Sequence, residues 1–175
     1  MAKDYLNIIE RAMMMGISDK INSAVTGDVY VFGQFPETED LKFPAIVVQQ
    51  VSSGFEEQFF GDNITFGSSS TSGSGEAYGI AFLVHVFVDK ETTIKIDTTG
   101  NGTPDTDYKQ RRLLNWLMLN VANSVTDLNW DTYKESNLEV TERYLRGWRN
   151  IGFIRDLQWY GASADFLLFF KNFRV

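Results

Sequence analysis

The sequence feature that most constrains the fold is the run from Tyr78 to Val88. Apolar residues occupy nearly every position in it, at Ile80, Phe82, Val84 and Val86 and also at the intervening Leu83 and Phe87. Successive side chains of a strand point to opposite faces, so this run predicts a strand with two apolar faces. Such a strand lies in the middle of its sheet and is covered on both sides. The rest of the chain must therefore supply flanking strands and covering layers.

Two segments have the periodicity of amphipathic helices, Tyr5–Val25 and Tyr108–Val125. Their apolar residues recur every three to four positions, which places them on one stripe. Asp4 is the expected N-cap of the first helix, and Gly27 follows its end. The stripes consist of Ile8, Ile9, Ala12, Met13, Ile17 and Ile21 in the first helix, and Leu113, Leu114, Leu117, Met118, Val121 and Val125 in the second.

Further strands are expected on both sides of the central one. The segment Gly61–Glu76 is rich in Ser, Thr and Gly, a composition typical of a flexible coil. We therefore expect Phe43–Val88 to form a strand, a long arm and a return strand. The polar segments Gln34–Lys42 and Asp89–Asp107 are expected to be connections. The remaining predicted strands are Val29–Phe32, Leu138–Arg146, Ile151–Trp159 and Asp165–Val175.

The order of helices and strands predicts an α+β fold. Helices separated from runs of strands give a mostly antiparallel β-sheet packed by two α-helices, here with a long flexible β-hairpin arm. No internal repeat or domain boundary is visible, so residues 1–175 are expected to form a single domain.

Composition excludes several classes of function. The chain has no cysteine, which excludes disulfides, thiolate metal sites and cysteine nucleophiles. It is expected to fold in a reducing cytoplasm without covalent cross-links. The first residues lack the apolar core of a signal peptide, and no run reaches the roughly 18 apolar residues of a membrane span. We therefore expect no membrane partner.

The net charge of −7 bears on nucleic-acid binding. Affinity for duplex DNA comes mostly from Lys and Arg that contact phosphates, so an acidic chain is a poor DNA binder as a whole. The same charge suits a surface that DNA slides past without specific binding. Taken alone, the charge is better explained by ordinary solubility.

Few residues are available for catalysis. His85, the one histidine, falls within the central strand and is interpreted as a structural polar residue. A hydrolase would require a positioned Ser and acid beside it, and no G-x-S-x-G turn is present. Glu56 and Glu57 would point to opposite faces of a strand. Together with the pair Glu37 and Glu39, they are interpreted as solvated edge charges. We therefore predict no catalytic residue and no cofactor.

The segment Asp97–Asp107 is a weak candidate for a cation site. Asp97, Asn101, Asp105 and Asp107 supply oxygens at the spacing of an EF-hand-like or thrombospondin-type calcium loop. Thr99 stands at the third position, and the twelfth is Tyr108, where a bidentate acid would be needed. A turn-rich loop that leads into the second helix is the alternative interpretation.

Residues 142–149, ERYLRGWR, form a basic and aromatic cluster that Arg155 extends. Arg with Tyr and Trp can stack on bases and bind phosphates, and the same residue types are enriched at the energetic centres of protein–protein interfaces. In an acidic chain we favour an interface. The predicted protein-interface residues are Phe60, Asp62, Ile64, Phe66 and Glu76 of the arm, and Arg143, Tyr144, Arg146, Trp148 and Arg149 of the cluster.

The layout resembles that of the tail-terminator proteins of long-tailed bacteriophages. The resemblance consists of the first helix, the strand start at Phe43-Pro44-Ala45-Ile46-Val47, the arm through Gly61–Glu76, the strand Tyr78–Val88 and the helix YKQRRLLNWLMLNVANSV. It covers nearly the whole chain but includes no diagnostic motif. Related neck and head-completion proteins share similar folds, and Asp89–Asp107 is longer than a minimal member would need.

The resemblance implies a structural virion protein located at the tail–neck region and assembled in the host cytoplasm. Members of that family form a homohexameric ring on the last ring of the tail tube. The ring stops tube polymerisation and docks the tail to the head, and DNA passes through its centre. The implied partners are other copies of the chain, the tail tube protein and a head-completion or connector protein. A head–tail connector and, more distantly, a nucleic-acid-binding module that uses Arg143–Arg149 remain alternatives.

Overall fold

The computed structural model describes residues 5–37, 40–65, 72–132 and 138–173. Side chains are described for these residues except 5–6, 52–65, 72–78, 131, 138 and 172–173. The predicted N-cap Asp4 therefore lies outside the described residues. In chain order the elements are α1 (Tyr5–Asn22), β1 (Val25–Thr26), β2 (Tyr30–Phe32), β3 (Ala45–Thr65), β4 (Ser72–Asp89), β5 (Thr93–Ile96), β6 (Thr106–Lys109), α2 (Gln110–Thr126), the 3₁₀ turn Trp130–Thr132, β7 (Leu138–Ile154) and β8 (Trp159–Phe173).

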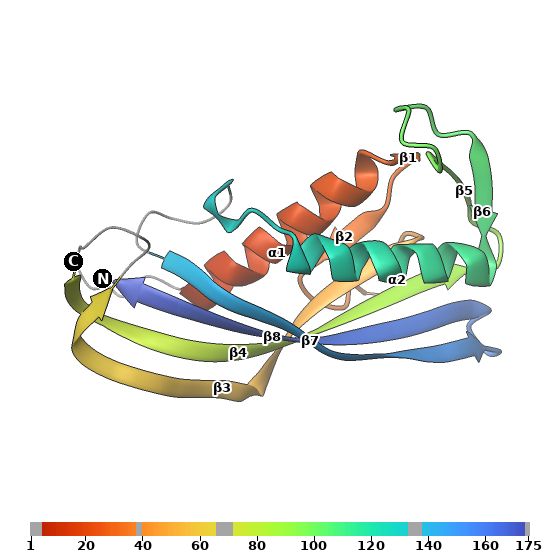
Figure 1. Cartoon of the computed structure of the whole chain (residues 1–175). Coiled ribbons are helices and arrows are strands. Elements are labelled where there is room, and N and C mark those ends of the chain that lie inside the picture. Colours follow the sequence, from red (N-terminus) through yellow and green to blue (C-terminus); the bar gives the residue numbers. More distant parts are fainter. Residues whose placement is uncertain (1–4, 38–39, 66–71, 133–137, 174–175) are drawn as a thin grey trace.

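The main sheet has five strands in the order β2-β3-β4-β8-β7. Its long ladders, β3 with β4, β4 with β8 and β8 with β7, are antiparallel, and only the short β2 runs parallel to its neighbour β3. Both helices lie on one side of this sheet (Figure 1). The predicted α+β class is therefore confirmed, and β4 has the central position expected from its sequence.

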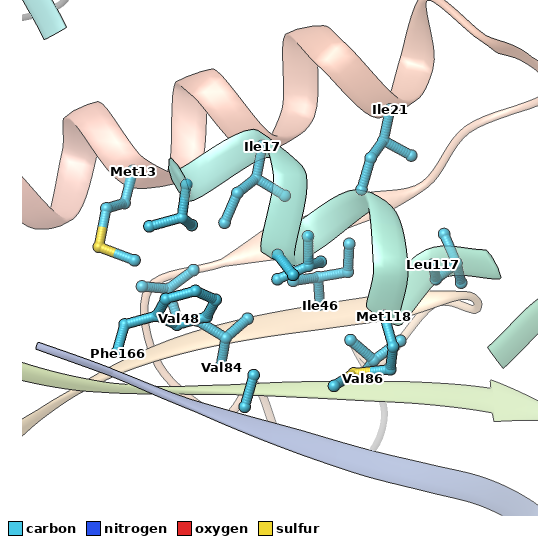
Figure 2. Close-up of a cluster of buried hydrophobic side chains, with 14 of the residues drawn as sticks. Met13, Ile17, Ile21, Ile46, Val48, Val84, Val86, Leu117, Met118 and Phe166 are labelled. Atoms are coloured by element: carbon cyan, nitrogen blue, oxygen red, sulfur yellow. The ribbon is translucent and has the colours of Figure 1, made fainter. Parts of the chain in front are cut away.

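The core lies between the two helices and one face of the sheet. Figure 2 shows Met13, Ile17 and Ile21 of α1 and Leu117 and Met118 of α2 directed toward Ile46, Val48, Val84, Val86 and Phe166 of the strands. The even-numbered positions of β4 from Ile80 to Val88 are all fully buried on this face. Each large apolar side chain that is buried fully contributes about 1.5–3 kcal/mol, so this face accounts for most of the driving force for folding.

The second face of β4 is covered only in part, contrary to the expectation from its apolar residues. Ala45, Val47 and Phe87 form a small buried cluster at one end, packed by Phe32, Leu41, Phe43 and Trp159. Leu83 and His85 remain half-buried on the same face. The segment before β3 takes the place of a second layer at this end, and neither helix covers the rest of the face (Figure 1).

Both predicted helices are present with small shifts at their ends. α1 ends at Asn22, and Val25 instead enters β1, where it pairs with Ile96 of β5. Gly16 lies in the middle of α1 and has a packing role. A Cβ at this position would come 2.2 Å from Leu128 Cδ1, so the absence of a side chain lets the segment after α2 lie against α1. Among the described residues, no helix has the length and apolar character of a membrane span.

A second sheet, of three strands in the order β1-β5-β6, is absent from the predicted elements. We expected Asp89–Asp107 to be a polar connection, but Thr93–Ile96 forms β5 and pairs with β6. Ile94 and Ile96 are buried against the main core. Two apolar residues in a four-residue strand are too short a pattern to separate from a loop.

The strand boundaries predicted for the C-terminal third of the chain are wrong. β7 is a single strand of 17 residues, the turn lies at Arg155–Gln158, and β8 begins at Trp159. The predicted strand Ile151–Trp159 therefore spans a turn. Register shifts between Leu145 and Gly147 and between Asn150 and Gly152 break the alternation of β7 without ending its pairing with β8. Such β-bulges insert an unpaired residue and shift every later side chain to the opposite face.

The arm is more regular than its composition suggests. The backbone of β3 pairs with β4 as far as Thr65 opposite Ser72, with three register shifts. Much of the segment Gly61–Glu76 is thus part of a paired β-hairpin, and Phe66 lies outside the described residues.

Two leucines of α2 provide a matched test of this core. Leu117 is fully buried, whereas Leu119, on the same helix, is 50% exposed. Leu117→Ala should lower the free energy of unfolding by about 2–5 kcal/mol because it leaves a cavity among well-packed neighbours. Leu119→Ala should change it by less than about 0.5 kcal/mol. Urea denaturation measures both; equal effects would contradict the described position of α2.

Candidate protein interface

β7 is one edge of the main sheet and the most apolar exposed element of the described chain. It pairs with β8 on one side, and no described strand pairs with its other side. Its large exposed hydrophobic side chains are Tyr144, Leu145, Trp148, Ile151 and Phe153, of which Trp148 is 54% exposed. Edge strands usually carry charges, bulges or cover that prevent pairing with other chains. β7 has bulges and arginines, but its aromatic residues remain accessible.

The exposed apolar residues of β7 lie on both faces of the sheet. Their faces follow from their partners on β8, because paired residues of neighbouring strands share a face. Leu145 is opposite Phe166, a residue of the core, whereas Tyr144 is opposite Leu167 on the face away from the helices. The Tyr144 ring meets Phe169 edge-on, with ring centroids 6.0 Å apart. The Tyr144 hydroxyl donates to the Glu142 carboxylate, and this hydrogen bond raises the pKa of Tyr144. The edge thus presents apolar side chains on both faces of the sheet.

The three arginines of β7 are each placed by a contact within the chain. Arg143 donates from Nη1 to the Leu128 carbonyl, which connects the strand to the segment after α2. Arg146 Nε lies 3.7 Å from Asp165 Oδ2, and both side chains remain substantially exposed. Arg149 donates from Nε to Ser163 Oγ at 3.4 Å. These contacts orient the guanidinium groups along the edge and leave part of each accessible.

Arg149 belongs to a row of paired residues, most of them polar, that crosses the sheet on the face away from the helices. Cross-strand pairing places Val47, His85, Ser163 and Arg149 next to one another on β3, β4, β8 and β7. Burial, and after it the positive charge of Arg149, lower the pKa of His85. A hollow of about 320 Å³ opens beside this row, lined by Leu83, Gly147, Trp148, Arg149, Ser163 and Asp165. A smaller one of about 120 Å³ lies on the helix side of Trp148, toward Asn115 and Met118 of α2.

Ser163, His85 and Asp165 are the residue types of a serine-hydrolase triad, but their arrangement differs from one. A nucleophilic serine needs a base that accepts its proton. Here the Ser163 hydroxyl faces a guanidinium donor, and the Ser163 side chain is only 3% exposed. The interpretation of His85 as a sheet residue agrees with its position between β3 and β8. Ser163 and Asp165 were not singled out in the sequence, although they are the polar positions of the alternating run 162–166.

The predicted interface residues fall into two groups. Arg143, Tyr144, Arg146, Trp148 and Arg149 all lie on β7, within one edge. The backbones of Phe60, Asp62 and Ile64 lie in β3 and that of Glu76 in β4, while Phe66 and all five side chains are outside what the structure describes. The structure thus separates the arm from the cluster, with β4 and β8 between β3 and β7.

The candidate cation loop is organised by hydrogen bonds within itself. Asp97 Oδ1 accepts from the backbone N–H groups of Thr99, Gly100 and Asn101, and Oδ2 accepts from Gly102 at 2.6 Å. Partial desolvation raises the pKa of Asp97, but the N–H groups of Gly102, Gly100 and Thr99 outweigh it and hold the pKa below its ordinary value. Asp97 therefore caps a turn with the oxygens that a cation would need.

The other members of the predicted cation set are dispersed around this turn. The Asn101 side chain accepts from Thr103 N–H, Asp105 accepts from the Thr106 hydroxyl, and Asp107 lies in β6 opposite Lys95. Within the described ranges, no three Asp, Glu or His side chains gather where they could hold a metal ion. The geometry favours the interpretation of a turn over that of an ion site.

The predicted carboxylate pairs do not form a described site. Glu56 and Glu57 are consecutive residues of β3, with backbones opposite Gly79 and Tyr78. Glu37 is exposed, and Glu39 lies outside the described residues.

Comparison with known proteins gives no family assignment. A scan against models of known protein families finds no match, and a search of curated proteins finds none either.

The electrostatic contact between Arg149 and His85 can be tested by titration, since the chain has one histidine. Arg149→Gln removes the positive charge, so the pKa of His85 should rise; burial should still keep it below the ordinary value. The imidazole C–H resonances followed by NMR over pH report this pKa. Arg155→Gln, which removes an arginine of the β7–β8 turn, is the control and should leave the titration unchanged. Equal shifts in both variants would disprove the described contact.

The same pKa predicts how stability depends on pH. The folded His85 binds its proton less readily than the unfolded one, whose pKa is roughly 6.5. The contribution of His85 to the free energy of unfolding is therefore fully present above the unfolded pKa of roughly 6.5. It is lost as pH falls from there through the lowered pKa of the folded state. His85→Gln should flatten the rise of the unfolding free energy in that window. Urea denaturation at several pH values checks this; an unchanged slope would contradict it.

Proposed function

We propose that the chain is a structural assembly subunit of a bacteriophage particle, in the role of a tail terminator. It would form a ring, of six copies by the resemblance, on the end of the tail tube, stop tube polymerisation and dock the tail to the head. The proposal is supported by the layout of two helices on one face of a sheet with a long hairpin, which agrees with the tail-terminator resemblance.

The observation that carries the proposal is the exposed edge strand β7. In a protein that acts as a monomer we would expect Trp148, Tyr144 and Leu145 to be buried, since exposed apolar side chains on a sheet edge favour association with other chains. Residues of these types, with arginines among them, are enriched where proteins bind proteins. A subunit that completes its fold by packing against neighbours accounts for this edge.

Charge supports the proposed relation to DNA. The net charge of −7 would repel a duplex passing through a ring, so DNA would not be retained. The alternative of a nucleic-acid-binding module relies on Arg143, Arg146 and Arg149. Arg143 already donates to a carbonyl of the same chain, which weakens that alternative.

The experiment is deletion of the gene from the phage genome that carries it, followed by electron microscopy of the particles. Loss of a terminator should give tails of uncontrolled length without attached heads. Tails of normal length that are separated from heads would instead indicate the head–tail connector. Normal infectious particles would contradict both structural roles.

A further inference from the structure

The charges of the chain are divided between two segments. From Phe43 to Asp89, which includes all of β3 and β4, the sequence has no Lys or Arg and carries the acids Glu56, Glu57, Asp62, Glu76 and Asp89. From Arg143 to Arg155 it has no acid and carries Arg143, Arg146, Arg149 and Arg155. In a chain of net charge −7, the second segment is a local basic exception.

β3 of the first segment and β7 of the second lie toward opposite edges of one sheet, with β4 and β8 between them. β2 pairs with β3 only at Ala45, Ile46 and Val47, so from Val48 onward β3 has no described strand on its outer side. β7 has none on its outer side at the other edge. Three strand spacings separate β3 from β7, about 14 Å, which exceeds the Debye length of about 8 Å at physiological salt. Across the sheet of one copy, the two sets of charges therefore neutralise each other little.

We propose that the acidic strand β3 of one copy's β3–β4 hairpin pairs with the basic, aromatic part of β7, Arg143–Ile154, of a second copy. The inference rests on the proposed role as an assembly subunit and names the contact through which copies join. Main-chain hydrogen bonds between the two free edges give the pairing, as in strand addition to a sheet edge. Arg146 and Arg149 meet acids of the hairpin, and Trp148 loses its exposure to solvent.

The geometry makes this contact head-to-tail. Each copy offers β3 at one edge and β7 at the other, so every added copy exposes a fresh edge of each kind. A heterologous contact of this type generates a ring when its rotation closes and a filament when it does not.

Two other uses of β7 are less favourable. Pairing of β7 with β7 of a second copy would bring the two sets of arginines together, and like charges across a sheet repel. Binding of DNA by β7 would bring a polyanion to a chain whose other charges are mostly acidic. Pairing of β7 with a hairpin that has no basic residues avoids both the repulsion between arginines and the repulsion between DNA and an acidic chain.

The test uses two charge-reversed proteins and their combination. The hairpin variant is Glu57→Lys with Asp62→Lys, both on β3, and the edge variant is Arg146→Glu with Arg149→Glu. Self-association is measured by sedimentation velocity up to about 1 mM protein, and circular dichroism verifies that each variant is folded. The matched control is Arg111→Glu with Arg112→Glu, two exposed arginines on helix α2 rather than on a strand of the sheet.

The expected result is that each variant alone associates at least about tenfold more weakly than the wild type, because opposed charges become like charges. A 1:1 mixture of the two variants should recover the association, since each reversed edge then meets its complement. The control should associate as the wild type does. Hydrogen exchange should show backbone amides of both β3 and β7 protected on association.

Several results would overturn the proposal. These are a wild type that stays monomeric at about 1 mM, a hairpin variant that associates normally, or a mixture without recovery. Loss of DNA binding by the edge variant with unchanged self-association would assign β7 to nucleic acid instead. None of these outcomes alters the deletion phenotype, which tests the tail role separately; a normal deletion phenotype with complementary mixing would retain the contact and reject the tail role.

Discussion

The structure depends on the packing of both helices against the same face of the five-stranded sheet. α1 and α2 together cover the fully buried side chains of β4 and the core positions of β8, from Ala162 to Phe170. Because this single layer contains nearly all of the buried apolar volume, the other face is free to carry polar and half-buried residues. The row through His85, Ser163 and Arg149 exists on that second face for this reason.

The large elements could be predicted from the sequence because their signals are strong and local. The alternation of Tyr78–Val88 identified the central strand, and the stripes ending at Ile21 and Val125 identified the two helices. β5 and β6 could not be found in this way, since a strand with only Ile94 and Ile96 as apolar residues has too little pattern. The boundary between β7 and β8 was misplaced because bulges at Arg146 and Ile151 shift the alternation inside a continuous strand.

Some residues of the candidate site could be found from the local sequence, and others only from the pairing of the strands. The cluster Arg143–Arg149 is contiguous, so sequence alone singled it out as an interface. Its neighbours Ser163 and Asp165 join it only through the register of β8 with β7, and His85 through the register of β4 with β8. Registers result from the competition of whole strands for the buried face, and no short motif specifies them. The separation of the arm from the arginines by β4 and β8 likewise required the strand order.

The folded molecule has different structures at its two ends. The hairpin of β3 and β4 extends beyond one end of the helical layer, and the small sheet β1-β5-β6 stands at the other, beside the start of α2 (Figure 1). Rotation about one axis carries each copy of a molecule into the next without turning it over. An assembly built by rotation about an axis along the direction from hairpin to small sheet would therefore set all hairpins on one side and all small sheets on the other, and its two sides would be chemically different surfaces.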